Sequence, residues 1–110
     1  MELGGPAYLG VSVTLVAANT NYNLLTLLRA IDPNAMSAGR EVVIQNDPDN
    51  TGGPVVSVGD SEMGAGRRGY KLALGASRTY RSSQNQDVYL ANKFLRSTVM
   101  GTVVNVEVSA

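Results

Sequence analysis

The amino-acid sequence predicts a mainly β protein: an antiparallel β-sandwich or jelly-roll-like barrel of about six to eight short strands, with one short helix near the N-terminus. Three observations support this fold class. Apolar and polar residues alternate in several short runs, which is the period of a strand with one buried face. Turn-forming residues separate these runs at intervals of roughly 8 to 15 residues. Only one segment repeats its apolar residues at helical spacing.

The first strand is expected over Leu9–Ala17, where every second residue is apolar. One helix should follow, because apolar residues then recur at spacings of three and four. They are Leu24, Leu25, Leu27, Leu28 and Ile31. Asn19–Asn21 can cap its start, and Asp32–Pro33 should end it, so about three turns fit between them. We expect this apolar stripe to close one end of the sandwich; the alternative is an exposed face that binds a partner.

Further extended segments are expected at intervals along the rest of the chain. They are Glu41–Gln45, Val55–Val58, Tyr70–Leu74, Arg78–Arg81, Val88–Leu90 and Thr102–Val108. Asn46–Pro54 is rich in Asn, Asp, Gly and Pro, and it should form the turn between the first two of these segments. We interpret Asn92–Met100 as a connection.

The chain of 110 residues has the length of one globular domain. We expect residues 8–110 to form this domain. Residues 1–7 contain glycine and proline but few packing side chains, so they should form a flexible arm that can dock on a neighbour. The apolar run Tyr8–Ala18 is interrupted by polar residues and is far shorter than the roughly 20 residues that cross a bilayer. No transmembrane helix or secretory signal is expected.

The composition excludes several kinds of catalyst. The sequence contains no His, Cys or Trp, so thiol catalysis, imidazole acid–base chemistry, disulfides and the usual zinc ligand sets are not possible. Ser61 in the Gly59–Ser61 turn could act as a nucleophile only with a lysine or carboxylate as its base. We therefore predict a protein without catalytic activity and without a cofactor.

Two short motifs look like ligand sites but lack the necessary context. Gly64–Gly69 has the letters of a dinucleotide-binding loop, but the residues after it alternate like a strand, which favours a flexible hairpin or surface loop. Asp47, Asp49 and Asn50 could supply oxygen ligands to Ca²⁺. Because the distant glutamate of the full calcium loop is missing, we favour an ordinary turn and predict no metal site, although a cation in this loop stays an open alternative.

The net charge is zero, with nine Lys and Arg against nine Asp and Glu, so the chain lacks the basic excess of a dedicated nucleic-acid binder. This zero is a cancellation. Residues 1–66 hold two of the nine cations and seven of the nine anions, and residues 67–110 hold the converse. An acidic part and a basic part suit contacts between copies of the chain or with an oppositely charged protein.

The densest group of cations alternates with two tyrosines, Tyr70 and Tyr80. Such a group could bind phosphates and bases, but we favour contact with protein carboxylates, in the same chain or a neighbour, and expect neither a nucleic-acid nor a membrane partner. Another interpretation is that these residues lie on both faces of exposed strands. The predicted partner interface combines this group with the N-terminal arm: Glu2, Leu3, Pro6, Arg67, Arg68, Lys71, Arg78 and Arg81.

Several short motifs follow one another along the chain: Asn50-Thr51-Gly52, Val58-Gly59-Asp60-Ser61, Tyr70–Gly75 and Val88-Tyr89-Leu90. Their order, over most of the chain from about Val11 to Val108, resembles small β-sandwich virion proteins of tailed bacteriophages. The resemblance implies a structural protein without an active site, made in the host cytoplasm and carried on the capsid surface. Its expected role is a decoration or cement protein that binds the major capsid protein as a homo-oligomer or through lattice contacts between copies.

Two alternatives to a decoration protein stay open. One is a neck, tail or head-fibre adaptor of the virion. The other is a carbohydrate- or receptor-binding module, which would need a shallow cluster of exposed aromatic side chains.

Overall fold

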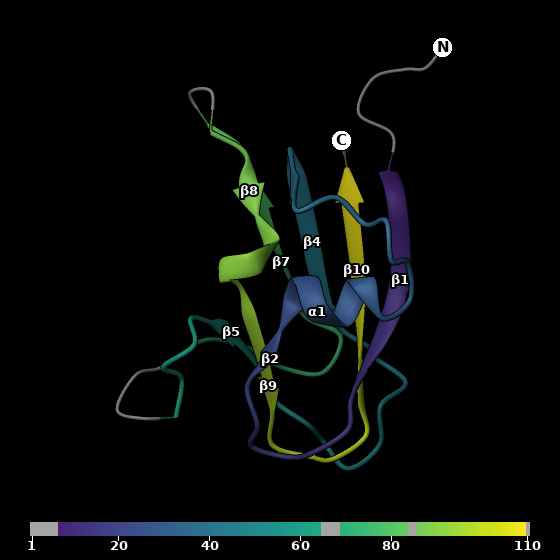
Figure 1. Ribbon diagram of the computed structural model, residues 1–110. Coiled ribbons are helices and arrows are strands. Elements are labelled where there is room, and N and C mark those ends of the chain that lie inside the picture. The colour runs from purple at the N-terminus through teal and green to yellow at the C-terminus, as the bar shows by residue number, and fades with distance from the viewer. Residues whose placement is uncertain (1–6, 65–68, 84–85, 110) are drawn as a thin grey trace.

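A computed structural model describes residues 7–64, 69–83 and 86–109, which form ten short strands, one α-helix and one 3₁₀ helix (Figure 1). The strands are β1 (Ala7–Leu15), β2 (Tyr22–Asn23), β3 (Ala38–Gly39), β4 (Glu41–Asn46), β5 (Val56–Gly59), β6 (Tyr70–Leu72), β7 (Ser77–Arg81), β8 (Val88–Tyr89), β9 (Phe94–Ser97) and β10 (Thr102–Ser109). The helices are α1 (Leu24–Arg29) and η1 (Leu90–Asn92). The predicted class, mainly β with one short helix, is confirmed.

The strands pair in a nested order. β1 pairs with β10, β2 with β9, β3 with β8, β4 with β7 and β5 with β6, and every pair is antiparallel. Two further pairings join four of these strand pairs into sheet A, in the order β1-β10-β4-β7, and sheet B, in the order β2-β9-β5-β6, while β3 and β8 form a separate two-stranded sheet. One long hairpin folded over on itself in this way has the topology of a jelly roll.

The core lies between sheets A and B. Inward and outward residues alternate strictly along β4 and β10, so that Val42, Ile44 and Val104 are completely buried while the residues between them face out. The largest buried side chains come from both sheets and from the helices: Leu15, Ile44, Leu72, Leu95, Leu24, Leu28 and Leu90. Burial of this many leucines and valines is the main source of stability for a chain of this size.

The helix is shorter than expected and begins later. It spans only Leu24–Arg29, and its cap is Asn23, whose Oδ1 accepts a hydrogen bond from the Thr26 N–H at 3.1 Å. The prediction of a cap at Asn19–Asn21 was wrong, because the chain first crosses to sheet B as β2. In Figure 1, α1 lies in front of β4 and β10, where its buried leucines join the core. Ile31 follows the helix and is 51% exposed, so it does not belong to the buried stripe.

The largest departure from the predicted elements is β9. This strand pairs with both β2 and β5 at the centre of sheet B, in a segment interpreted as a connection. The sequence does not show the apolar–polar alternation of a half-buried strand here. The inward positions are Leu95 and the polar Ser97, while the outward positions are the aromatic Phe94 and Arg96. The other boundaries differ less: β1 ends at Leu15, and it begins at Ala7, inside the segment predicted as an arm. Residues 1–6 of that segment lie outside the described residues.

Candidate functional site

The basic residues predicted to act together are placed on different sides of the sandwich. Lys71 on β6 faces outward from sheet B, on the side opposite the buried Leu72. Arg78 and Arg81 lie on β7 with opposite orientations: Arg78 pairs in register with the buried Ile44, whereas Arg81 is on the outer face of sheet A. The remaining predicted interface residues fall outside the described residues; they are Glu2, Leu3, Pro6, Arg67 and Arg68.

Arg81 has a partner within the chain. Its Nε lies 2.8 Å from Oε2 of Glu41, which faces it across the β4–β7 ladder. The Arg81 side chain is 76% exposed, so this ion pair contributes little to stability. Contact with a carboxylate of the same chain, one of the expected alternatives, therefore occurs for this residue.

Arg78 is stacked between two tyrosines at the open edge of the sandwich. Its guanidinium carbon lies 3.9 Å from the ring centre of Tyr70 on β6 and 4.9 Å from that of Tyr80 on β7. Its Nε is buried and has no hydrogen-bond partner among the described residues. The alternation of Arg and Tyr thus forms a cation–π stack that joins the edges of the two sheets.

Lys93 extends this stack, with its Nζ 4.8 Å from the Tyr80 ring centre. Burial lowers the pKa of Lys93 below its usual 10.5, and the positive charge of Arg78 lowers it further. Burial raises the pKa of Tyr80 above 10.0, although Arg78 partly opposes this change. These pKa shifts indicate that the side chains of Lys93 and Tyr80 are partly shielded from water.

A pocket of about 340 Å³ opens on the outer face of sheet B. Ser57 of β5 lies at its centre, because it pairs with Lys71 of β6 on one side and with Arg96 of β9 on the other. Neighbouring strands are about 4.8 Å apart, which places the backbones of the two basic residues about 10 Å apart across the pocket. The other lining residues are Val55, Met63, Gly64, Gly69 and Thr98.

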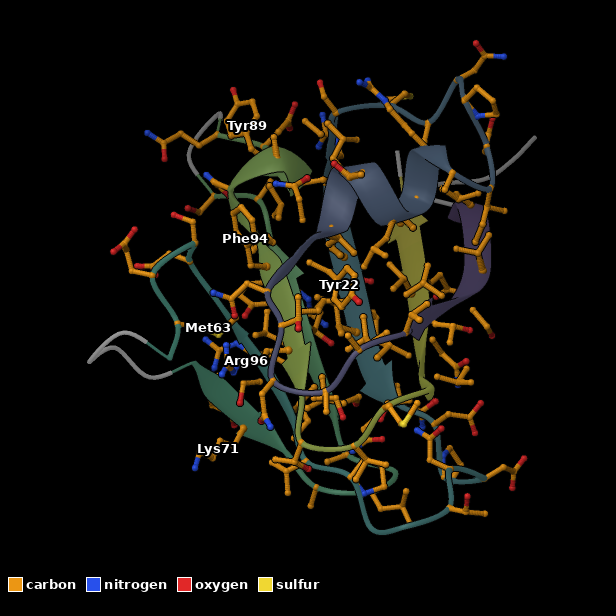
Figure 2. All side chains as sticks on the ribbon, turned by 60° about the horizontal axis from the view of Figure 1, so that its bottom comes forward. Tyr22, Met63, Lys71, Tyr89, Phe94 and Arg96 are labelled. Atoms are coloured by element: carbon orange, nitrogen blue, oxygen red, sulfur yellow. The ribbon has the colours of Figure 1, made fainter. Side chains whose placement is uncertain are left out.

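The guanidinium of Arg96 is held in place by its surroundings. Its Nη1 donates a hydrogen bond to Oδ1 of Asn21 at 3.2 Å, and Nδ2 of Asn21 donates in turn to the carbonyl of Met63 at 2.8 Å. Gly64 has φ +87°, a conformation that favours glycine, and a Cβ there would lie 2.7 Å from Arg96 Nη1 and would displace the guanidinium. Figure 2 shows Arg96 beside Met63, with Lys71 on the same side of the molecule.

Among the described residues, the lining of the pocket includes two cations and no acidic side chain. Within residues 7–64, 69–83 and 86–109 the one ion pair is that of Arg81 with Glu41, so neither Lys71 nor Arg96 has a carboxylate within 4 Å there. Two cations and the Ser57 hydroxyl are hydrogen-bond donors suited to an anion. A planar carboxylate fits this arrangement, because a guanidinium can donate two parallel hydrogen bonds to it.

The Asp47–Asn50 segment forms a turn in which the side chains bond to the protein itself. Asp47 Oδ1 accepts from the Asp49 N–H at 2.8 Å. The Asn50 amide both donates to the Val103 carbonyl and accepts from the Val103 N–H, at 2.8 and 2.9 Å. This geometry is that of the favoured ordinary turn. Over the part of the chain that the structure describes, no group of three or more His, Cys, Asp or Glu side chains is arranged to hold a metal.

The described part of the chain also contains no helix of sufficient length and apolarity to cross a membrane. Comparison with protein-family models and with curated protein sequences finds no match to this chain.

Two residues of the pocket, Arg96 and Ser57, were not among the site residues predicted from the sequence. The signal for them was the pairing of β5 with β6 and β9, which requires β9 to be identified as a strand.

Proposed function

We propose that this protein is a non-enzymatic structural protein of a tailed-phage virion, a decoration protein that binds and stabilises the capsid shell. The observation that supports this most is the pocket between Lys71 and Arg96, which we expect to receive an acidic side chain of the major capsid protein. The resemblance of the sequence motifs to virion proteins supports it as well. Jelly rolls occur in viral capsid proteins, which agrees with this role.

The pocket suits a repeated contact on a lattice. Its two cations lie on the strands that flank β5, so the spacing of their backbones is fixed by the sheet. The hydrogen bond of Arg96 to Asn21 holds this guanidinium before a partner binds, which reduces the order lost on binding. A shell offers the same acidic group many times. Each copy would make one contact of modest affinity with the shell, and copies that also contact one another would together be strongly attached.

Reconstitution of the particle tests the proposal. Shells from which this protein has been stripped should rebind it and then resist heat or osmotic rupture better than bare shells. Lys71→Glu should weaken rebinding by about tenfold or more, because it places an anion beside the acidic partner group. Arg81→Glu reverses a charge at an exposed position on the other sheet and should rebind like the unmodified protein.

Equal rupture resistance of shells with and without the protein would contradict the cementing role. Copy number then separates the remaining virion roles, because a shell protein is present in many copies per particle and a neck, tail or head-fibre adaptor in few. Normal rebinding of the Lys71→Glu variant would show that the shell contact lies elsewhere on the molecule.

One observation favours a carbohydrate-binding module as a second candidate. Tyr89 is 55% exposed and lines a groove of about 280 Å³ together with Tyr80, Asp87 and Asn92. An aromatic ring beside planar polar groups can contact both the apolar face and the hydroxyl groups of a sugar. Binding on a glycan array that is lost in Tyr89→Ala would support this function, and an array without signal would exclude the glycans it carries.

A further inference from the structure

β1 lies at one edge of sheet A, with β10 on one side and no strand on the other within the described residues. Figure 1 shows β1 at the border of the sheet. Apart from the Gly101 N–H that donates to the Leu15 carbonyl, no backbone hydrogen bond outside the β1·β10 ladder reaches β1 from the described chain. An edge strand of this kind presents a row of N–H and C=O groups that can pair with another strand.

The four edges of the two sheets are not equally protected. β2 has two residues, and β6 has three, one of which is Lys71. β7 carries two arginines, Arg78 and Arg81. Short length and basic side chains are the usual devices that prevent edge-to-edge pairing. β1 has nine residues with the sequence AYLGVSVTL, without a charge or a proline. Its register shift lies at its start, between Ala7 and Leu9, so the edge from Leu9 to Leu15 is regular and has none of these devices.

The side chains of β1 also favour a neighbour. Leu9 and Val11 face the core but are only partly buried, and within the described residues no strand lies beside β1 on the side away from β10. The residues on the opposite face, Gly10, Ser12 and Thr14, are small and exposed. A second strand beside β1 would continue the apolar row on one face and would meet no bulky group on the other.

We propose that β1 pairs antiparallel with β1 of a second copy across a two-fold axis, which joins two four-stranded sheets into one of eight strands. The strand is complementary to itself: with no charge on it, symmetric pairing brings no like charges together, and its partly buried apolar residues face one another. Two-fold pairing also occupies the free β1 edge of each copy, so no such edge is left for a third copy and the assembly stops at a dimer. This inference does not depend on the shell contact, because the pocket with Lys71 and Arg96 lies on sheet B.

The absence of cysteine from the sequence makes a direct test possible. Single substitutions Gly10→Cys, Ser12→Cys and Thr14→Cys place one thiol on the exposed face of β1 and sample the register. Residues opposite each other in antiparallel strands have Cα atoms about 4.5 to 5.5 Å apart, within the range of a disulfide. At least one of these variants, alone or in an equimolar mixture with one of the other two, should form a disulfide-linked dimer in dilute solution under mild oxidation; the mixtures cover the registers in which two different residues lie opposite each other.

Thr79→Cys is the matched control, because Thr79 is exposed on the same face of sheet A but lies on β7 at the opposite edge. This variant should still dimerise through β1 but should form no disulfide-linked dimer under the same conditions. Failure of all three β1 variants and of their pairwise mixtures to form a linked dimer, or equally rapid linkage through Thr79→Cys, would overturn the proposal.

A charge pair provides a second test that does not need oxidation. Sedimentation should show the unmodified protein as a dimer at micromolar concentration, and Ser12→Lys and Ser12→Glu should each be folded monomers. Mixing these two variants should restore a dimer, since the opposite charges then meet, whereas Thr79→Lys should dimerise normally. An unmodified protein that stays monomeric throughout this concentration range would contradict the proposal.

Discussion

The guanidinium of Arg78 lies 3.9 Å from the ring centre of Tyr70, so a cation on the edge strand of sheet A is stacked on an aromatic ring from the edge strand of sheet B. β6 and β7 follow each other in sequence, but no ladder pairs them. The stack therefore spans the open side of the jelly roll, where neither sheet has a further strand within the described residues. Arg78, which the sequence predicted to lie in a partner interface, therefore contributes here to the packing of the fold.

Replacement of Arg78 should lower stability. Arg78→Ala removes contacts with both the Tyr70 and the Tyr80 ring, and we expect the free energy of unfolding to fall by about 1 to 2 kcal/mol, the value of a partly desolvated cation–π contact. Arg81→Ala should cost less than about 0.5 kcal/mol, because its ion pair is exposed. Urea denaturation of the two variants checks this difference, and equal losses would contradict the structural role of Arg78.

Lys93 should lose its proton below pH 10.5. Because burial and Arg78 both lower its pKa in the folded state, its contribution favours folding above pH 10.5 and is lost as the pH falls through the folded-state pKa. The raised pKa of Tyr80 acts in the opposite sense, since its contribution is present below pH 10.0 and is lost at higher pH. The net change in stability is therefore a poor measure, and the titration itself should be followed.

Carbon-13 NMR of the lysine Cε atoms can measure this titration. The sequence contains two lysines, so Lys71→Arg leaves the signal of Lys93 alone. We expect a midpoint below 10.5 that rises when Arg78→Met removes the neighbouring positive charge. A midpoint at or above 10.5, or one that does not respond to Arg78→Met, would be inconsistent with the structure.

Asn46 should tolerate substitution poorly. It is completely buried, and its Nδ2 donates to the carbonyls of Pro54 at 3.0 Å and Leu72 at 3.1 Å. Asn46→Leu leaves both carbonyls without this donor inside the protein and should reduce the free energy of unfolding by about 2 to 4 kcal/mol. The same change at the exposed Asn34 should have an effect within about 0.5 kcal/mol. Chemical denaturation distinguishes these outcomes, and a small loss at Asn46 would mean that water replaces the amide.

Two glycines in different surroundings should respond differently to alanine. A Cβ at Gly39 would lie 2.7 Å from Val108 Cγ1 and 2.9 Å from the Ser109 carbonyl oxygen, so Gly39→Ala should destabilise the fold by about 1 to 3 kcal/mol. At Gly10 nothing lies within 4 Å, and Gly10→Ala should be neutral or stabilise by up to about 1 kcal/mol. Thermal unfolding of both variants tests this; the reverse order of melting temperatures would contradict the described packing.

The predictions that succeeded depend on local patterns. Strict alternation in β4 and β10 and the turn residues after Asn46 identified strands and their ends, because these features depend on residues that are close in sequence. β9 was not predicted, because its inward positions include the polar Ser97. Alternation identifies a strand only when the inward face is apolar and the outward face is polar. The helix cap was misplaced because the hydrogen bonds of β2 with β9 determine where the helix can begin.

By itself, the sequence determined the mainly β class, the single helix, the absence of histidine and cysteine chemistry, and the division into an acidic and a basic part. Only the tertiary structure decided which cations lie together. Lys71 and Arg96 flank one pocket, whereas Arg78 and Arg81, three residues apart, face opposite sides of one strand. The physical reason is that side chains alternate between the faces of a strand, and strand partners are chosen by packing between distant segments. Closeness in sequence therefore did not predict closeness in space.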